Sequence, residues 1–335
     1  MFYKIAKIWS PEIFQGHGKT NTYFEGWYYK LIDEKGKYAI AVIPGVFISE
    51  NKERSNAFVQ ILDGHAGHVT YHQFPIDQFW ASKKILEIRI GKNMFRRDFI
   101  QLDIHSSDQQ VNGQIRMSHL TSWPVTVMSP GIMGRYAFVP FMECYHGVIS
   151  LNHQLSGLLQ VNGKQIDFEN GRGYTEKDWG KSFPSSYIWM QSNHFDKPGI
   201  SLTASIANIP WLRGAFRGFI IGFLYNGILH RFTTYTKATV KDVHITETQV
   251  SFIAYDKNYS MKINVKRSAG GLIHAPLHRN RLEEMEMQRR VSQSLTGKIS
   301  IEFWEKNNAG ERLIYSGTGQ HAGIEVHGNL REILN

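Results

Sequence analysis

The chain shows almost no helical periodicity. Short runs of β-branched and aromatic residues, separated by turn signals, dominate it instead. Asn-Gly pairs occur at 112–113, 162–163, 170–171 and 226–227. Asn-Gly between two strand-like runs is a strong hairpin signal, because both turn residues need positive φ. The pair at 226–227 is the clearest, since strand-like runs flank it at 216–225 and 228–236. The pattern predicts an all-β fold, built as an antiparallel barrel or sandwich.

Further runs of the same character predict strands at 37–48, 57–62, 85–90, 99–106 and 298–305. Helix is expected only in short pieces such as 279–290, where Glu286 and Arg290 have the spacing of a helical ion pair. A chain of 335 residues is longer than a typical single domain, so we expect two domains, residues 1–155 and 156–335. The boundary is placed where a strand-like run gives way to a glycine-marked segment.

Composition and motifs exclude several classes of function. The net charge is +9, but the basic residues are scattered and interleaved with acids, so no nucleic-acid partner is expected. Cys144 is the only cysteine, which excludes a disulfide framework and a cysteine-based zinc cluster. The chain contains no G-x-G-x-x-G or Walker loop, so no nucleotide cofactor is expected. His65, His68 and His72 fall in a predicted hairpin turn without a partner cluster, so no metal site is expected.

Segment hydropathy predicts a protein without an integral membrane segment. The N-terminal sequence lacks the apolar core and the small-residue cleavage site of a signal peptide. No run approaches the roughly 20 apolar residues of a transmembrane helix. We therefore expect a cytoplasmic protein. Its positive charge predicts a transient, peripheral attraction to anionic membrane surfaces, which would suit a lipid-soluble ligand.

The segment from Gly171 to Phe195 holds the strongest candidates for chemistry. In an extended chain Tyr174, Glu176 and Asp178 share one face, and Lys177 and Trp179 share the other. Two acids on one apolar face raise each other's pKa, and burial raises it further. Such a pair can keep one carboxylic acid protonated at neutral pH, ready to donate its proton.

Two other strand-like runs carry aromatic and polar side chains on one face. Glu25, Trp27 and Tyr29 alternate onto one face of the first run, and Trp189, Gln191 and Asn193 onto one face of the second. With an aromatic content of 13%, these rings are expected to line a cavity for a hydrophobic small molecule. The two faces can meet across such a pocket, where Gln191 and Asn193 would orient a phenol.

Five ordered blocks of sequence together resemble the tocopherol cyclase family, namely 24–31, 142–151, 171–184, 189–193 and 321–328. The resemblance implies two lipocalin-like antiparallel β-barrel domains with few short helices, related in fold to carotenoid 1,2-hydratases. It also implies closure of a prenylated hydroquinone to a chromanol. Plant members of the family carry Asn at the position of Asp178, which leaves Glu176 as the shared acid.

The resemblance and the residues together suggest cofactor-independent acid catalysis: cyclisation, or hydration of an alkene, in a prenylated quinol or related isoprenoid. Glu176 would protonate the alkene, with Asp178 and Glu25 as further candidate acids. Aromatic faces would stabilise the resulting cation, the candidates being Trp27, Tyr29, Trp179 and Trp189. A closed barrel would exclude water.

Two alternatives remain open. The protein can be a non-catalytic binder or carrier of a hydrophobic small molecule, and Glu176 and Asp178 can be buried structural acids satisfied by Arg172, Lys177 or backbone N–H groups where the two domains meet. A catalyst would need Glu176 in the cavity without a cationic partner.

Overall fold

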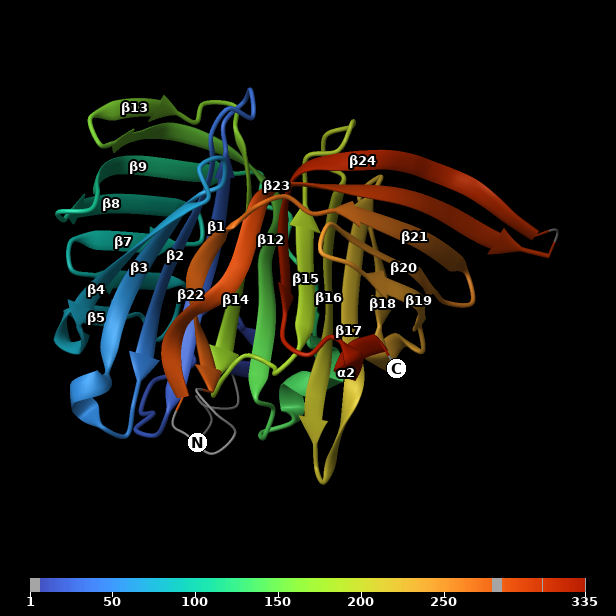
Figure 1. Cartoon of the computed structure of the whole chain (residues 1–335), viewed down its shortest axis with the longest axis horizontal. Coiled ribbons are helices and arrows are strands. Elements are labelled where there is room, and N and C mark those ends of the chain that lie inside the picture. The colour runs from blue at the N-terminus through green and yellow to red at the C-terminus, as the bar shows by residue number, and fades with distance from the viewer. Residues whose placement is uncertain (1–6, 279–284, 309, 335) are drawn as a thin grey trace. The chain divides into compact units, whose positions relative to one another are not determined.

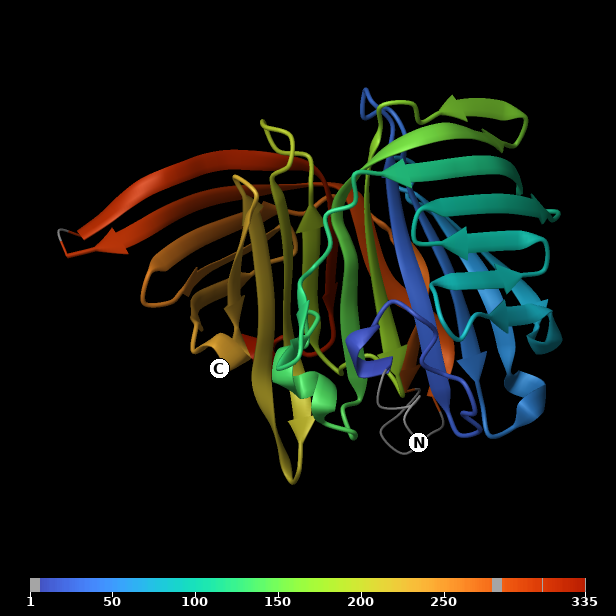
Figure 2. The same ribbon diagram turned by 180° about the vertical axis from the view of Figure 1, so that it is seen from behind.

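The computed structural model describes residues 7–278, 285–308 and 310–334, and its strands pair antiparallel throughout these ranges (Figures 1 and 2). The chain divides into two compact units. Unit 1 comprises Met1–Phe183 and Leu272–Arg290, and unit 2 comprises Pro184–Gly271 and Val291–Asn335. The chain passes from unit 1 to unit 2 between Phe183 and Pro184, whereas the boundary expected near residue 155 falls inside a long strand of unit 1.

The sheet of unit 1 runs in the order β4-β3-β2-β1-β14-β12-β9-β8-β7-β6-β5 among the described residues, with β13 paired to β12. Its strands are β1 (Tyr23–Ile32), β2 (Ala39–Ile48), β3 (Asn56–Asp63), β4 (His68–Pro75), β5 (Phe79–Ala81), β6 (Glu87–Ile90), β7 (Asn93–Arg96), β8 (Phe99–His105), β9 (Gln110–Ser118), β12 (Cys144–Val161), β13 (Lys164–Asp167) and β14 (Arg172–Gly180). The sheet folds back on itself, so that β1–β4 and β6–β9 form two layers around one apolar core (Figures 1 and 2).

Smaller elements complete unit 1. They are the hairpin of β10 (Val125–Thr126) and β11 (Ser129–Pro130), and the 3₁₀ turns η1 (Lys7–Trp9), η2 (Lys52–Arg54), η3 (Ile76–Gln78) and η4 (Gly134–Phe138). β22 (Gly271–His278) lies against β3, since the side chain of Gln60 accepts from the backbone N–H of His274 at 2.8 Å and donates to its carbonyl oxygen at 2.9 Å. These paired bonds satisfy a buried amide and fix the position of the strand.

Unit 2 is built on a second sheet, whose order is β18-β17-β16-β15-β24-β23-β21-β20-β19. Its elements are β15 (Tyr187–Ser192), β16 (Ser201–Trp211), β17 (Gly214–Tyr225), β18 (Ile228–Thr233), η5 (Thr234–Thr236), β19 (Thr239–Ile245), β20 (Gln249–Tyr255), β21 (Tyr259–Lys266), β23 (Met285–Asn307, which enters this unit at Val291), β24 (Gly310–His327) and the helix α2 (Arg331–Leu334). It encloses a second apolar core. The predicted all-β architecture of two lipocalin-like units is confirmed.

Two of the Asn-Gly pairs form the predicted hairpin turns. Asn226 and Gly227 have φ of 50° and 75° between β17 and β18, and the pair at 162–163 has φ of 49° and 79° between β12 and β13. The pair at 112–113 behaves differently, because it lies inside β9. There Gly113 has φ of 136°, and a Cβ atom built on it would stand 2.2 Å from the carbonyl oxygen of Leu158. Glycine at this position permits close approach of β9 to β12 instead of a turn.

Two local predictions are wrong. Residues 285–290 belong to strand β23 instead of a helix, and 279–284 lie outside the described residues. The isolated i,i+4 charge pair was therefore a poor indicator, because sheet pairing overrides weak helix propensity. His65 does lie in a turn, but His72 is buried in β4, where its Nε2 contacts the hydroxyl of Thr70 at 3.1 Å.

Candidate functional site

Strand β14 carries the predicted acids, and its pairing decides what each of them meets. It lies between β1 and β12, with Asp178 opposite His146 and Glu176 opposite Val148 on β12. On the other face, Lys177 lies opposite Trp27 of β1. The strand alternation read from the sequence is thus present, and it separates Glu176 and Asp178 from Lys177.

An imidazole joins the two carboxylates. His146 Nδ1 lies 2.8 Å from Asp178 Oδ1, and its Nε2 lies 3.5 Å from Glu176 Oε2. The hydroxyl of Tyr174 donates a short hydrogen bond to the same oxygen of Glu176. Burial alone would lower the pKa of His146, but the Asp178 and Glu176 carboxylates outweigh it and raise this pKa to about 9. At neutral pH, His146 is therefore a cation held between two acids.

This cluster differs from the arrangement inferred from the sequence. The two acids share a face as predicted. Glu176 has a cationic neighbour in His146, however, whereas a catalytic Glu176 was expected to lack a cationic partner. The sequence reasoning did not single out His146, although it lies in the block at 142–151 that carries the family resemblance. The missing information was the pairing of β12 with β14, which brings together residues 32 positions apart.

Glu25 forms a buried ion pair on the opposite face of β14. Its Oε1 lies 2.6 Å from Lys177 Nζ, and both side chains are fully buried. Its carboxylate also accepts the backbone N–H groups of Gln15, at 2.9 Å, and Gly16, at 3.0 Å, together with the hydroxyl of Tyr23. A carboxylate this fully satisfied has little capacity to donate a proton, so these contacts favour the structural alternative for Glu25.

Lys177 ties the N-terminal segment to the sheet. Its ammonium group donates to the carbonyl oxygens of Pro11, at 2.8 Å, and Ile13, at 2.5 Å. The same group lies 5.1 Å from the ring centre of Trp27 and 4.5 Å from that of Trp179. These two rings, which were predicted to face a carbocation, therefore each already face a lysine cation.

The remaining predicted ligand-binding residues fall into two groups. Trp27 and Tyr29 are fully buried core residues, with the Trp27 indole N–H donating to the backbone carbonyl oxygen of Glu12 and the Tyr29 hydroxyl donating to that of Arg96. Their roles in unit 1 are accounted for by packing.

Trp189, Gln191 and Asn193 belong to unit 2, on β15 and just beyond it, and all three are buried. Gln191 Nε2 lies 3.5 Å from Asn193 Oδ1, and that oxygen lies 3.0 Å from His194 Nδ1. The two amides thus form a polar row of their own, and their predicted role in orienting a phenol stays a prediction.

A pocket of about 500 Å³ opens in unit 1 next to the cluster. Its wall includes His146, Trp179, Tyr145 and Tyr23, together with the exposed lysines at 19 and 181. Tyr145 stacks on Trp179 with 5.6 Å between ring centres. Of the three charged members of the cluster, His146 is the one in this wall, so it is the group that a bound molecule can touch.

The same cluster has the spacing of a metal site. His146, Glu176 and Asp178 each offer one ligand atom, and these atoms lie within 4.8 Å of one another. One imidazole and two carboxylates are a set that could hold a divalent cation. Among the residues that the structure describes, His146, Glu176 and Asp178 have the spacing of metal ligands. His65, His68 and His72 do not form a group with that spacing. The 2.8 Å contact between His146 and Asp178 is that of a hydrogen bond.

Comparison with known proteins places the chain. A family model described as tocopherol cyclase-like matches residues 100–328. A rice protein described as a probable chloroplastic tocopherol cyclase (Oryza sativa subsp. japonica) is 25% identical over 213 residues, covering 61% of this chain and 44% of that protein. The chloroplastic tocopherol cyclase of Zea mays is 26% identical over 204 residues, covering 58% and 41%. The chain thus spans less than half the length of these relatives.

Solved structures share the fold at low identity. The crystal structure of CghA with Sch210972 has a TM-score of 0.53 and 9% identity, covering 92% of this chain and 89% of that one. A crystal structure from Nitrosomonas europaea has a TM-score of 0.50 and 12% identity, covering 92% of each chain. At these identities the likeness shows the fold alone. Within the described residues, we find no helix of the length and hydrophobicity that crossing a bilayer requires.

Proposed function

Because the chain belongs to the tocopherol cyclase-like family, we propose that it adds a hydroxyl group across an alkene of a prenylated quinol or related isoprenoid, without a cofactor. If the hydroxyl is the substrate's own phenol, the product is a cyclic ether; if it is water, the product is an alcohol. The observation that carries this proposal is the position of His146, which lies between two carboxylates in the wall of a pocket of about 500 Å³.

The proton donor in this proposal is the imidazolium of His146. Asp178 holds Nδ1 at 2.8 Å, whereas Nε2 lies 3.5 Å from Glu176, beyond a good hydrogen bond, so the Nε2 proton is the freer one. It passes to one alkene carbon and leaves a tertiary cation on the other. The hydroxyl oxygen then bonds to the cation and returns its proton to neutral His146. Every atom and charge is recovered, so one residue serves as acid and then as base.

The two carboxylates act through His146. Asp178 orients the ring, and Glu176 stabilises its charged form, which makes both of them positioning residues in this proposal. An imidazolium with a pKa of about 9 is a weak donor to an alkene, so the cation needs additional stabilisation. The ring of Tyr145 lines the pocket and can supply it, at about 0.5–2 kcal/mol for a close contact. Glu176, the acid predicted from the sequence, thus keeps a role in the proton transfer without contacting the substrate.

The experiment is turnover of a prenylated hydroquinone followed by mass spectrometry. A cyclised product keeps the mass of the substrate, and a hydrated product gains the mass of one water. His146→Gln should lower turnover by roughly 10²–10⁴ while binding of the quinol changes little; because the variant also loses its contacts with Glu176 and Asp178, turnover is measured below its melting temperature and per folded protein. Glu176→Gln and Asp178→Asn should show smaller losses. Treatment with a chelator is the control for a metal at the cluster, and loss of turnover with restoration by a divalent cation would contradict the proposal.

The carrier function remains the second candidate, since the pocket alone would serve it. A carrier would quench tryptophan fluorescence with a saturable micromolar response to the same quinol and yet form no product. Product formation by the unaltered protein, lost in His146→Gln, excludes this candidate. Saturable binding without product in both proteins would support it.

Exposed apolar side chains near the pocket suggest how a lipid-soluble substrate reaches it. Val127 and Met128, at the tip of the β10–β11 hairpin, are 74% and 78% exposed. The carbonyl oxygen of Val127 accepts the indole N–H of Trp9 at 3.1 Å, and Trp9 contacts the ring of Phe138 in the pocket wall. The apolar tip and the pocket rim are therefore continuous in unit 1.

We propose that this tip contacts anionic membrane surfaces transiently, with the exposed Lys19 and Lys181 of the pocket wall adding attraction. Co-sedimentation with vesicles containing phosphatidylserine should fall when Val127 and Met128 are both replaced by Glu. If the variant bound these vesicles as well as the unaltered protein does, the tip would have no role. If the unaltered protein bound neutral vesicles equally well, the lysine charges would have no role.

A further inference from the structure

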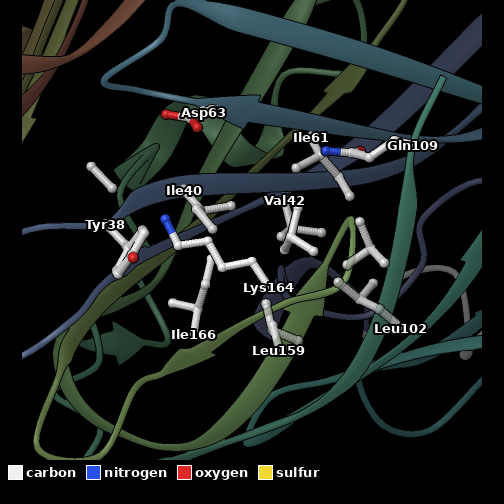
Figure 3. Close-up of a pocket in the computed structure, with 13 residues that line it drawn as sticks. Tyr38, Ile40, Val42, Ile61, Asp63, Leu102, Gln109, Leu159, Lys164 and Ile166 are labelled. Carbon is white, nitrogen blue, oxygen red and sulfur yellow. The ribbon is translucent and has the colours of Figure 1, made fainter.

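Unit 1 contains a second pocket, which shares no lining residue with the pocket at His146 (Figure 3). Its volume is about 120 Å³. Aliphatic side chains from six strands form most of its wall, among them Ile40, Val42, Ile61, Leu102, Leu159 and Ile166. These six side chains belong to the apolar core of the unit. The pocket is thus a gap inside the core that the surrounding side chains leave open.

An empty apolar cavity destabilises a fold in proportion to its volume, so a cavity of this size is a cost unless something fills it. The aliphatic part of the wall offers water no hydrogen-bond partners, so an apolar group displaces water from it readily. A cavity of about 150 Å³ with a similar lining is enough to bind benzene in an engineered protein. The volume here, about 120 Å³, therefore suits a single small ring or a short alkyl chain.

The rim of the pocket carries one cation, Lys164, and one carboxylate, Asp63. The ammonium group of Lys164 lies 5.0 Å from the ring centre of Tyr38 (Figure 3). The ammonium group of Lys37, outside the pocket lining, lies 5.5 Å from the same ring. A hydrogen bond from Lys164 lowers the pKa of the Tyr38 hydroxyl. The acidic residue of the rim, Asp63, accepts backbone N–H groups in the β3–β4 turn.

A second polar group lies deeper. Gln109 is 8% exposed, and its Oε1 accepts the hydroxyl of Thr70 at 2.6 Å. This bond sets the orientation of the amide, so that Nε2 serves as the donor toward the pocket (Figure 3). The pocket therefore combines an aliphatic wall with a few polar groups, namely the ammonium of Lys164, the carboxylate of Asp63 and the amide of Gln109, which is the pattern of a specific small-molecule site.

We propose that this pocket binds a small apolar carboxylate, such as a short fatty acid or a monocyclic aromatic acid. The hydrocarbon part fills the space between the aliphatic side chains, and the carboxylate pairs with Lys164 at the rim. The inference does not rest on the proposed reaction, because the two pockets share no residue.

The test compares hexanoate, hexanol and hexylammonium as probes by isothermal titration calorimetry on the full chain. Hexanoate should bind with saturation, and about tenfold or more tighter than hexanol, while hexylammonium should bind weakest. Lys164→Gln should weaken hexanoate about tenfold and leave hexanol unchanged. Lys164 is exposed, so this variant is expected to fold normally.

The matched control is Lys92→Gln, which removes the same charge from a side chain that is 81% exposed and does not line the pocket. It should leave the affinity for hexanoate unchanged. Ile166→Phe, which fills the pocket, should abolish binding of all three probes. Absence of saturable binding, equal affinity for hexanoate and hexanol, or equal effects of the two lysine variants would each overturn the proposal.

Discussion

Replacing Glu25 by Gln tests whether the buried acid of β1 is structural or catalytic. The carboxylate lies 2.6 Å from Lys177 Nζ with both side chains fully buried, so the variant leaves an ammonium ion in the core without its counter-charge. Removing one member of such a pair typically costs about 3–5 kcal/mol. For a unit of this size, each kcal/mol lowers the melting temperature by about 2–4 °C, so we expect a fall of roughly 6–20 °C.

Urea unfolding of the four proteins of a double-mutant cycle measures this coupling directly. The set is the unaltered chain, Glu25→Gln, Lys177→Met and the double variant. We expect the double variant to be more stable than the sum of the two single losses predicts, because it leaves neither charge unpaired. Lys177→Met also removes the two hydrogen bonds to Pro11 and Ile13, so it should expose the N-terminal segment to proteolysis.

The reasoning would be refuted if Glu25→Gln melted within about 1 °C of the unaltered protein. A loss of turnover in such a stable variant would instead identify Glu25 as one of the catalytic acids named from the sequence. If the double variant lost as much free energy of unfolding as the two single variants lose in total, the two charges would not interact.

Three further outcomes are expected. The pKa of His146 is raised from 6.5 to about 9, so its interactions stabilise unit 1 fully below pH 6.5 and are lost as the pH rises through 9. His146→Gln should therefore remove about 3 kcal/mol of pH dependence from the free energy of unfolding between these two pH values. An unchanged pH profile would contradict the shift. Turnover should likewise fall as pH rises through about 9, and a rate that increases across that range would refute an imidazolium donor. Gly113→Ala should cost more stability than Gly163→Ala, because both have positive φ but only the first would bring Cβ within 2.2 Å of a backbone oxygen, that of Leu158; thermal melts of the two variants that coincide would show that β9 and β12 can separate there.

Local patterns in the sequence were sufficient for the class of fold. The turn at Asn226 and Gly227 depends on two backbone angles that its own residues favour, so it could be predicted without any knowledge of distant contacts. The separation of Glu176 and Asp178 from Lys177 followed in the same way, because side chains alternate along any extended strand. The blocks resembling the tocopherol cyclase family extended these local inferences to the whole chain.

The partners of those side chains depended on the pairing of strands far apart in the chain. His146 comes to Asp178 because β12 pairs with β14, and Glu25 comes to Lys177 because β1 pairs with β14 on its other edge. Strand register is set by the burial of one whole face of the sheet, and no short segment contains that information. Burial and neighbouring charge then decide the protonation of each group, which is why sequence alone identified the acids and only the tertiary structure identified the imidazolium between them.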